Sequence, residues 1–199
     1  MPRPRVHDLE ALLDVAERLV ASAGAETVTV RGLAAAAGVP NGTIYHAFGS
    51  LGEVLARVWL RAASAFLDLQ TSLVDRASSP VEAVVAAADA PAAFAAVRPD
   101  GARMLLEVRG DRLFGPELPD ELADALHAVD KRLVALLVRL ARQLWDRGDG
   151  LAVEVITTCV VDLPTAFFRR DITDPLVRDR LAAAVRAVLT VPPPEKDRP

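Results

Sequence analysis

The chain has 199 residues, of which 52% are hydrophobic, and a formal net charge of −4. This composition is typical of one or two folded domains and excludes a chain that is disordered throughout. The single cysteine, Cys159, excludes an intrachain disulfide and a metal site of the Cys-x-x-Cys type. The acidic balance does not exclude nucleic-acid binding, because a local surface without carboxylates can still approach phosphates.

Charged residues interrupt the first apolar stretch at Asp14, Glu17 and Arg18, so we expect no signal peptide. The longest uncharged run, residues 32–52, contains Pro40 and several glycines, which argues against a membrane span. These features predict a soluble, cytoplasmic protein with no membrane partner.

Apolar residues recur at helical spacing through most of the chain, and no stretch shows the sustained alternation of a β-strand. Gly24 is a natural stop for the first helix. Ser50 with Glu53, and Ser79 with Glu82, have capping-box spacing and predict the starts of two long helices. Further helices are expected at residues 100–109, 120–147, 151–170 and 175–190, with a loop at 110–119.

Residues 28–48 have the pattern of two short helices joined by a tight turn. Thr29 can cap the first helix, and Gly38 can adopt the positive φ that the turn requires. Pro40 suits the first turn of the second helix, whose inward face would hold Ile44 and Phe48. The pattern predicts a helix-turn-helix, although a pair of core helices without DNA contacts would share these features.

The outward positions of the second helix hold Asn41, Thr43, Tyr45 and His46. These side chains can hydrogen-bond bases or phosphates, as a recognition helix in the major groove must. No acidic residue occurs from Thr27 to Gly52, which suits a surface that approaches phosphates. Taken singly, Tyr45 could be a packing residue and His46 a surface histidine.

The stretch resembles the helix-turn-helix of the TetR (tetracycline repressor) family of transcriptional regulators. The matching pieces are the Thr-Val-Arg start at residue 29, the Ala-Gly-Val turn, the Gly-Thr-Ile-Tyr-His segment, and Phe48 ahead of Ser50. The resemblance covers about residues 9–58. Beyond them only the number of helices and the chain length agree.

The resemblance implies an all-α fold of about nine helices. A helix-turn-helix domain would occupy residues 1–49, a helical ligand-binding and dimerisation domain residues 50–190, and a disordered, proline-rich tail residues 191–199. It implies a homodimer on a near-palindromic double-stranded DNA operator, with a small, largely apolar effector that weakens DNA binding. By matched position, the DNA contacts would come from Thr29, Arg31, Asn41, Thr43, Tyr45 and His46. Arg3 and Arg5 could add contacts from a flexible arm, although a short basic terminus is often only solvated.

Three positions depart from the family pattern. Pro40 stands where serine is common, which removes a cap or shifts it to Asn41. Gly32 replaces a polar residue and costs its helix about 1 kcal/mol relative to alanine. Leu51 stands where a phosphate-binding lysine is common, so we expect weaker non-specific DNA affinity than in a lysine-bearing relative.

Some apolar residues of the later helices could line an effector cavity, although core packing is the simpler interpretation for any one of them. Pro164 removes a backbone hydrogen bond inside a helix and predicts a kink near residues 160–164. Asp162 could face a ligand there, or form a salt bridge. The candidate pocket residues are Trp59, Phe66, Phe94, Met104, Trp145, Cys159, Asp162 and Phe167.

The helix at 151–170 is apolar on nearly all sides, so it needs to be buried on two sides. One side can pack on its own core, and the other on a partner chain, together with the helix at 175–190. The candidate interface residues are Ile156, Leu163, Val177, Leu181, Ala184 and Val188.

The sequence contains no nucleophile elbow, dinucleotide-binding or phosphate-loop motif, so we expect no enzyme activity, cofactor or metal. The favoured function is a ligand-responsive repressor. The alternatives are an activator or dual regulator, or a helical small-molecule-binding or scaffold protein whose DNA binding is weak or lost.

Overall fold

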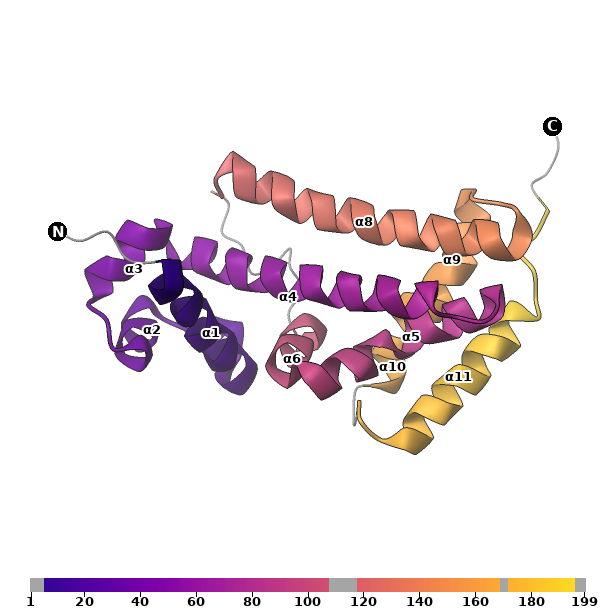
Figure 1. The fold of residues 1–199 in the computed structure, drawn as a ribbon, viewed down its shortest axis with the longest axis horizontal. Coiled ribbons are helices and arrows are strands. Elements are labelled where there is room, and N and C mark those ends of the chain that lie inside the picture. Colours follow the sequence, from indigo (N-terminus) through magenta and orange to yellow (C-terminus); the bar gives the residue numbers. More distant parts are fainter. Residues whose placement is uncertain (1–5, 108–117, 169–171, 196–199) are drawn as a thin grey trace. The chain divides into compact units, whose positions relative to one another are not determined.

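The computed structural model describes residues 6–107, 118–168 and 172–195, and within these ranges all regular elements are helical (Figure 1). The helices are α1 (Val6–Ala23), a 3₁₀ turn (Ala25–Thr27), α2 (Val30–Ala37), α3 (Asn41–Phe48), α4 (Leu51–Asp75), α5 (Pro80–Val97), α6 (Pro99–Glu107), α8 (Asp120–Trp145), α9 (Gly150–Thr157), a π-helical segment (Thr158–Asp162), α10 (Leu163–Phe167) and α11 (Pro175–Leu189). Helices α4, α5 and α11 begin directly after the capping residues that the sequence predicted. If residues 150–167 are counted as one interrupted helix, these described ranges hold nine α-helices, and the all-α prediction is confirmed.

Local capping explains several of these boundaries. The Ser50 hydroxyl accepts a hydrogen bond from the Glu53 backbone N–H at 3.1 Å, and Ser79 accepts one from Glu82 at 3.2 Å. Each bond satisfies one N–H that a helix start leaves without a partner. At the end of α1, Gly24 has a φ of +84° and donates to the Val20 carbonyl. The predicted starts of α4 and α5 and the predicted end of α1 are therefore confirmed.

The chain divides into two compact units. Unit 1 comprises residues 1–64 and 98–128, and unit 2 comprises residues 65–97 and 129–199. Unit 1 thus includes the first half of α4 and the whole of α6, in addition to the helix-turn-helix. This division differs from the predicted boundary at residue 49.

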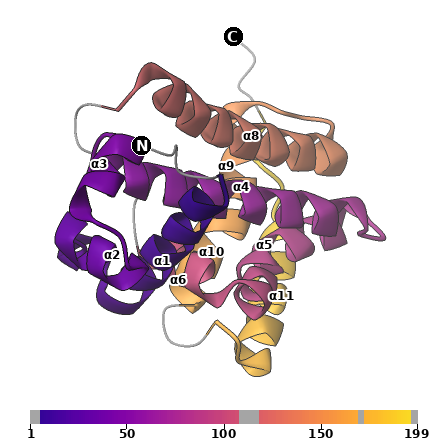
Figure 2. The same cartoon turned by 60° about the vertical axis from the view of Figure 1, so that its left-hand side comes forward.

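Unit 1 has its own apolar core, to which α1, α2 and α3 contribute. Figure 2 shows these three helices close together. α6 also packs on α1 and contributes Met104, which is 1% exposed. The main buried residues include Leu12, Val20, Leu33, Ile44, Val58 and Met104.

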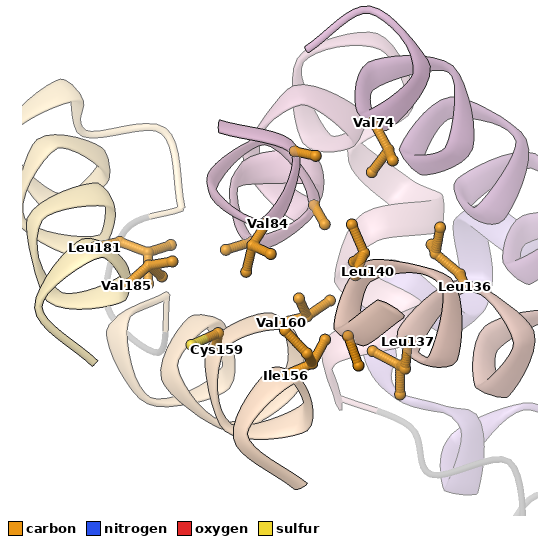
Figure 3. Close-up of a cluster of buried hydrophobic side chains, with 14 of the residues drawn as sticks. Val74, Val84, Leu136, Leu137, Leu140, Ile156, Cys159, Val160, Leu181 and Val185 are labelled. Carbon is orange, nitrogen blue, oxygen red and sulfur yellow. The ribbon is translucent and has the colours of Figure 1, made fainter. Parts of the chain in front are cut away.

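The core of unit 2 is formed by side chains from five helical segments that converge (Figure 3). Val84 of α5 faces Leu181 and Val185 of α11, while Ile156 and Cys159 close the cluster from the segment 150–162. These five side chains are essentially inaccessible to solvent. Burial also raises the pKa of the Cys159 thiol to about 11, so this cysteine is a packing residue rather than a nucleophile.

The helix predicted at 151–170 is interrupted. Between α9 and α10 the chain forms a π-helical turn, in which the Leu163 N–H donates to the carbonyl of Thr158, five residues earlier. Pro164 follows at once and cannot donate a hydrogen bond of its own. A π-helical segment thus lies where the kink was predicted, near residues 160–164.

α5 also contains a proline, Pro91, which leaves the carbonyl of Ala87 without its helical donor. The side chain of Gln70 supplies the missing bond: its Nε2 donates to the Ala87 oxygen at 2.9 Å. Gln70 is 1% exposed, so this amide lies in the interior of unit 2. A long-range side-chain contact thus takes the place of a backbone hydrogen bond.

The segment Val191–Glu195 packs against the turn between α8 and α9, which differs from the disorder expected for residues 191–199. Pro193 is buried, and Arg147 donates to the carbonyl of Pro194 at 2.9 Å. Arg147 also binds Asp149, which caps α9 through the backbone N–H groups of Leu151 and Ala152. One arginine therefore holds the cap and the tail together, and proline-rich composition alone did not reveal this anchor.

Candidate nucleic-acid interface

The start of α2 is built as predicted. The hydroxyl of Thr29 accepts a hydrogen bond from the Gly32 N–H at 3.0 Å. A Cβ atom at position 32 would lie only 3.2 Å from that hydroxyl oxygen. The glycine that departs from the family pattern therefore leaves room for the cap that holds α2 in place.

The turn between α2 and α3 depends on Gly38, which has the left-handed conformation with φ 67° and ψ 30°. The next residue, Val39, donates back to the Ala34 carbonyl at 3.0 Å. This pattern closes the end of α2 and sets the direction in which α3 leaves. The prediction for Gly38 is confirmed.

Pro40 was predicted to lie in the first turn of α3, but the helix begins one residue after it. It is the N-cap residue of α3, it makes no side-chain cap, and Asn41 is the first residue of the helix. The side chain of Asn41 is thus exposed and free of a capping bond to the helix. On the inward face, Ile44 and Phe48 are buried in the core of unit 1, as predicted.

The outward face of α3 presents polar groups to solvent. Tyr45 is 55% exposed, Asn41 and His46 are also exposed, and Thr43 is half-buried. Thr29 and Arg31 are exposed at the start of α2. Six of the eight predicted DNA contacts therefore occupy accessible positions on α2 and α3 or beside them; Arg3 and Arg5 lie outside the described residues.

Leu51 is the first residue of α4 and packs, half-buried, on the core of unit 1. An apolar side chain in this position offers no charge to a phosphate. The weaker non-specific DNA affinity expected from the sequence stays a prediction.

Three carboxylates of α1, those of Glu10, Asp14 and Glu17, surround Arg61 of α4. Its guanidinium binds Glu17 at 2.6 Å, Asp14 at 2.8 Å and Glu10 at 3.2 Å. Burial opposes the charge of Arg61, but the hydrogen bond and attraction of Glu17 outweigh it and raise the arginine pKa.

Glu17 has a second arginine partner. Arg98, which precedes α6, binds Glu17 at 3.3 Å, and Arg103 of α6 donates to the Ala21 carbonyl near the end of α1. Glu17 is 6% exposed, so it is a buried carboxylate shared by two arginines. These contacts attach α6 to α1 and neutralise acids that would otherwise lower the potential of unit 1.

The predicted effector residues are divided between the two units. Trp59 and Met104 pack on the core of unit 1, whereas Trp145, Cys159 and Phe167 pack on that of unit 2. Phe66 and Phe94 form an edge-to-face pair in unit 2, with ring centroids 5.6 Å apart. Asp162 is exposed, and its position facing a ligand stays a prediction.

Two predicted interface residues belong to the core of a single chain. Ile156 and Leu181 are 0% and 1% exposed, so neither can meet a partner, and this part of the prediction is wrong. Helical periodicity could not show which face of an all-apolar helix points inward. The other four candidates, Leu163, Val177, Ala184 and Val188, are half-buried.

A shallow groove of about 310 Å³, which the sequence did not predict, lies between α5 and α11. Its lining includes Val85, Ala86 and Ala182, together with the ion pair of Arg178 and Asp89. The sequence signal for it is weak, because small residues at helical spacing also occur in ordinary core contacts.

Comparison with known proteins agrees with this geometry. Residues 12–58 match the family described as bacterial regulatory proteins, tetR family. This range includes most of α1, the whole helix-turn-helix and the start of α4. No curated protein matches the sequence.

Several solved structures share the fold. AibR, in a complex with isovaleryl coenzyme A and operator DNA, is 18% identical with a TM-score of 0.69, covering 94% of this chain and 100% of that one. SCO4454, a TetR-family regulator from Streptomyces coelicolor, is 18% identical with a TM-score of 0.68, covering 92% and 95%. FadR from Bacillus subtilis, in complex with stearoyl-CoA, is 19% identical with a TM-score of 0.62, covering 91% and 95%.

Proposed function

We propose that the chain is a ligand-responsive repressor of the TetR family, whose family model matches residues 12–58. It binds a near-palindromic operator as a homodimer in the cytoplasm, and a small, largely apolar effector releases it. The helix-turn-helix reads the operator, and unit 2 provides the effector site and the dimer contacts.

One observation carries the DNA-binding role: α3 is anchored by Ile44 and Phe48 while Tyr45, Asn41 and His46 remain accessible. A helix fixed on its inner face loses little freedom when its outer face binds. Three acids of α1 are bound to Arg61 of α4, which reduces like-charge repulsion when the face of α2 and α3 approaches phosphates.

The effector role has separate support. AibR and FadR, which share the fold, were each solved with an acyl-coenzyme A. A ligand that binds one conformer of unit 2 more tightly would shift the population away from the conformer that fits two adjacent major grooves. This mechanism would apply to a repressor, and equally to an activator or dual regulator.

A non-DNA-binding scaffold is the alternative from another class, and Leu51 is the observation that favours it. If phosphate contacts are too few, specific binding fails even with an intact α3. The remaining contacts would then have to come from Thr29, Arg31, Tyr45, His46 and the arm with Arg3 and Arg5.

The test is selection of bound fragments from the genomic DNA of the source organism, followed by titration of the enriched site at several salt concentrations. We expect a palindromic site whose affinity falls steeply with salt. Tyr45→Ala should weaken binding about 10-fold or more, as expected for the loss of about 1–3 kcal/mol per good contact. Absence of any enriched site would favour the scaffold.

The matched control is Leu69→Ala on the half-buried side of α4 in unit 2, with folding of both variants checked by circular dichroism. If Tyr45→Ala binds DNA as the wild type does, α3 is not the reading helix. Addition of stearoyl-CoA or isovaleryl-CoA to the complex then tests effector release with defined probes.

A further inference from the structure

The chain contains a single asparagine, Asn41, and a glycine follows it directly. Asn41 is the first residue of α3, the helix proposed to read the operator. Asparagine before glycine is the pair most prone to deamidation, because glycine has no Cβ to shield its backbone nitrogen from the neighbouring carboxamide. The only asparagine of this chain therefore combines a reactive sequence with a place on the surface proposed to meet DNA.

The side chain of Asn41 is exposed, and among the described residues no hydrogen bond holds its carboxamide. The space beside Gly42 is also open. A Cβ atom placed there would have Cδ2 of His46 as its nearest side-chain neighbour, at 3.9 Å. The carboxamide is therefore free to turn towards the Gly42 nitrogen.

The first turn of α3 is fastened less firmly than the first turns of α2, α4 and α5. Thr29, Ser50 and Ser79 each accept a backbone N–H at the start of those three helices. Pro40 supplies no side-chain cap to α3, and Gly42 is a poor helix former in the same turn. A closed helical turn holds the carboxamide away from the next nitrogen, so the reaction requires this turn to open. Helix ends open locally at a low cost in free energy.

We propose that Asn41 is a deamidation site, and that its conversion permanently ends operator binding by chains that are not on DNA. The consequence rests on the proposed function, whereas the reaction itself does not. The Gly42 nitrogen bonds to Cγ of Asn41, the bond from Cγ to Nδ2 breaks, and the proton of the attacking nitrogen leaves with the amide as ammonia. Water then opens the cyclic imide at either carbonyl, which leaves aspartate or isoaspartate at this position.

Both products damage the reading face of α3. Asparagine offers a donor and an acceptor to a base edge, whereas an ionised carboxylate offers acceptors only. The new charge also faces phosphates from a segment, residues 27–52, that otherwise contains no acid. The aspartate form should stay folded, because a negative charge at the start of a helix is favourable. Operator binding is therefore lost without unfolding.

Operator DNA should slow the reaction. It covers the exposed face of α3 and binds the closed helix, so it reduces the population in which the first turn is open. Deamidation therefore removes chains that are not in use and spares those that occupy an operator.

Ageing of the full-length protein tests the proposal. The fresh chain is incubated at mildly alkaline pH, with and without the operator enriched in the genomic selection, and its intact mass is followed. We expect a gain of one mass unit, the difference between an amide and an acid. Peptide mapping should assign the gain to Asn41 rather than to the glutamines, Gln70 and Gln143. Excess operator should slow the gain in proportion to the fraction of the chain that is bound.

Anion exchange separates the aspartate form, which carries one additional negative charge. Its operator affinity should be about 100-fold weaker than that of the fresh chain, because like charges then oppose each other at the interface.

Gly42→Ala and Asn41→Gln are the matched controls. Alanine fits at position 42, which has open space and is not among the glycines with positive φ, and its Cβ shields the nitrogen. The longer glutamine side chain closes its ring far more slowly. Each variant should keep its mass on ageing, together with the operator affinity of its own fresh sample.

The same chain unfolded in guanidinium chloride gives the intrinsic rate. If the folded chain gains no mass while the unfolded chain converts completely, α3 stays closed and the proposal is overturned. An aspartate form that binds the operator as the fresh chain does overturns the proposed consequence and leaves operator binding standing. A fresh chain that binds no operator overturns the proposed function, and the mass gain still decides whether Asn41 is modified.

Discussion

The two units place their charges in different ways. In unit 1 the acids of α1 converge on Arg61 and Arg98, and the central carboxylate, Glu17, is buried. In unit 2 the ion pairs are exposed and link one helix to another, as Arg178 to Asp89 and Arg186 to Glu82 link α11 to α5.

The difference shows what each unit requires of its surface. The proposed function requires unit 1 to keep the face of α2 and α3 free of negative charge, and the acids of α1 are neutralised by arginines of other segments. The surface of unit 2 has no such requirement. Each of its exposed ion pairs adds little stability, although the pairs favour one alignment of α11 on α5. Four experiments test this difference between the charges of the two units, beginning with the largest expected effect.

A carboxylate placed on the exposed face of α3 should strongly weaken operator binding. Asn41→Asp changes one atom type at an exposed position at the start of α3, where a negative charge favours the helix. We expect operator affinity to fall about 100-fold, because like charges cost several kcal/mol at an interface. Fluorescence anisotropy with labelled operator measures the change.

The isosteric control is Gln143→Glu, at an exposed position on α8 in unit 2. It adds the same charge to the chain outside the helix-turn-helix and should leave affinity within about twofold of the wild type. Equal losses in both variants would mean that net charge, rather than the face of α3, governs binding.

The buried carboxylate should matter more to stability than its exposed neighbour. Glu17→Gln leaves two arginines without their shared partner and should lower the free energy of unfolding by about 2–4 kcal/mol. Glu10→Gln, whose side chain is 61% exposed, should cost less than about 1 kcal/mol. Urea denaturation compares the two, and similar losses would contradict the special role of Glu17.

The exposed pairs of unit 2 should have small individual effects. Arg178→Ala and Arg186→Ala should each change the free energy of unfolding by about 1 kcal/mol or less. A double-mutant cycle with Asp89→Ala isolates the Arg178 pair from other effects of truncation. A coupling energy well above that range would show that these pairs hold α11 as firmly as Glu17 holds α6.

The smallest effect concerns the Arg147–Asp149 pair. Hydrogen bonds from Arg147 lower the pKa of Asp149 from 3.8 to about 2. A lowered pKa means that the charged form stabilises the fold: the contribution is fully present above 3.8 and is lost as the pH falls through about 2. Asp149→Asn can keep the cap without the charge, so its stability difference from wild type should be constant above 3.8 and shrink towards pH 2.

Features set by neighbouring residues could be predicted from the sequence. The caps at Thr29, Ser50 and Ser79 and the turn at Gly38 depend on contacts within about four residues, so the residue types suffice. The inward positions of Ile44 and Phe48 followed from helical spacing.

Features set by distant residues could not be predicted. Arg98 and Glu17 are 81 positions apart, and neither residue type indicates the other, so the assignment of α6 to unit 1 was missed. Ile156 was placed on a partner-facing side because its helix is apolar all round. Only the packing of α5, α9 and α11 decides that this side chain points inward.

The bond from Gln70 to the Ala87 carbonyl has a consequence for how this chain can vary. Gln70 compensates for the hydrogen bond that Pro91 removes, so Gln70 is not free to change while Pro91 is present. Replacing Pro91 restores the helical donor and makes the buried amide dispensable, whereas replacing Gln70 first leaves a buried carbonyl unsatisfied. Homologues should therefore keep this glutamine and this proline together or lose them together, with the proline lost first.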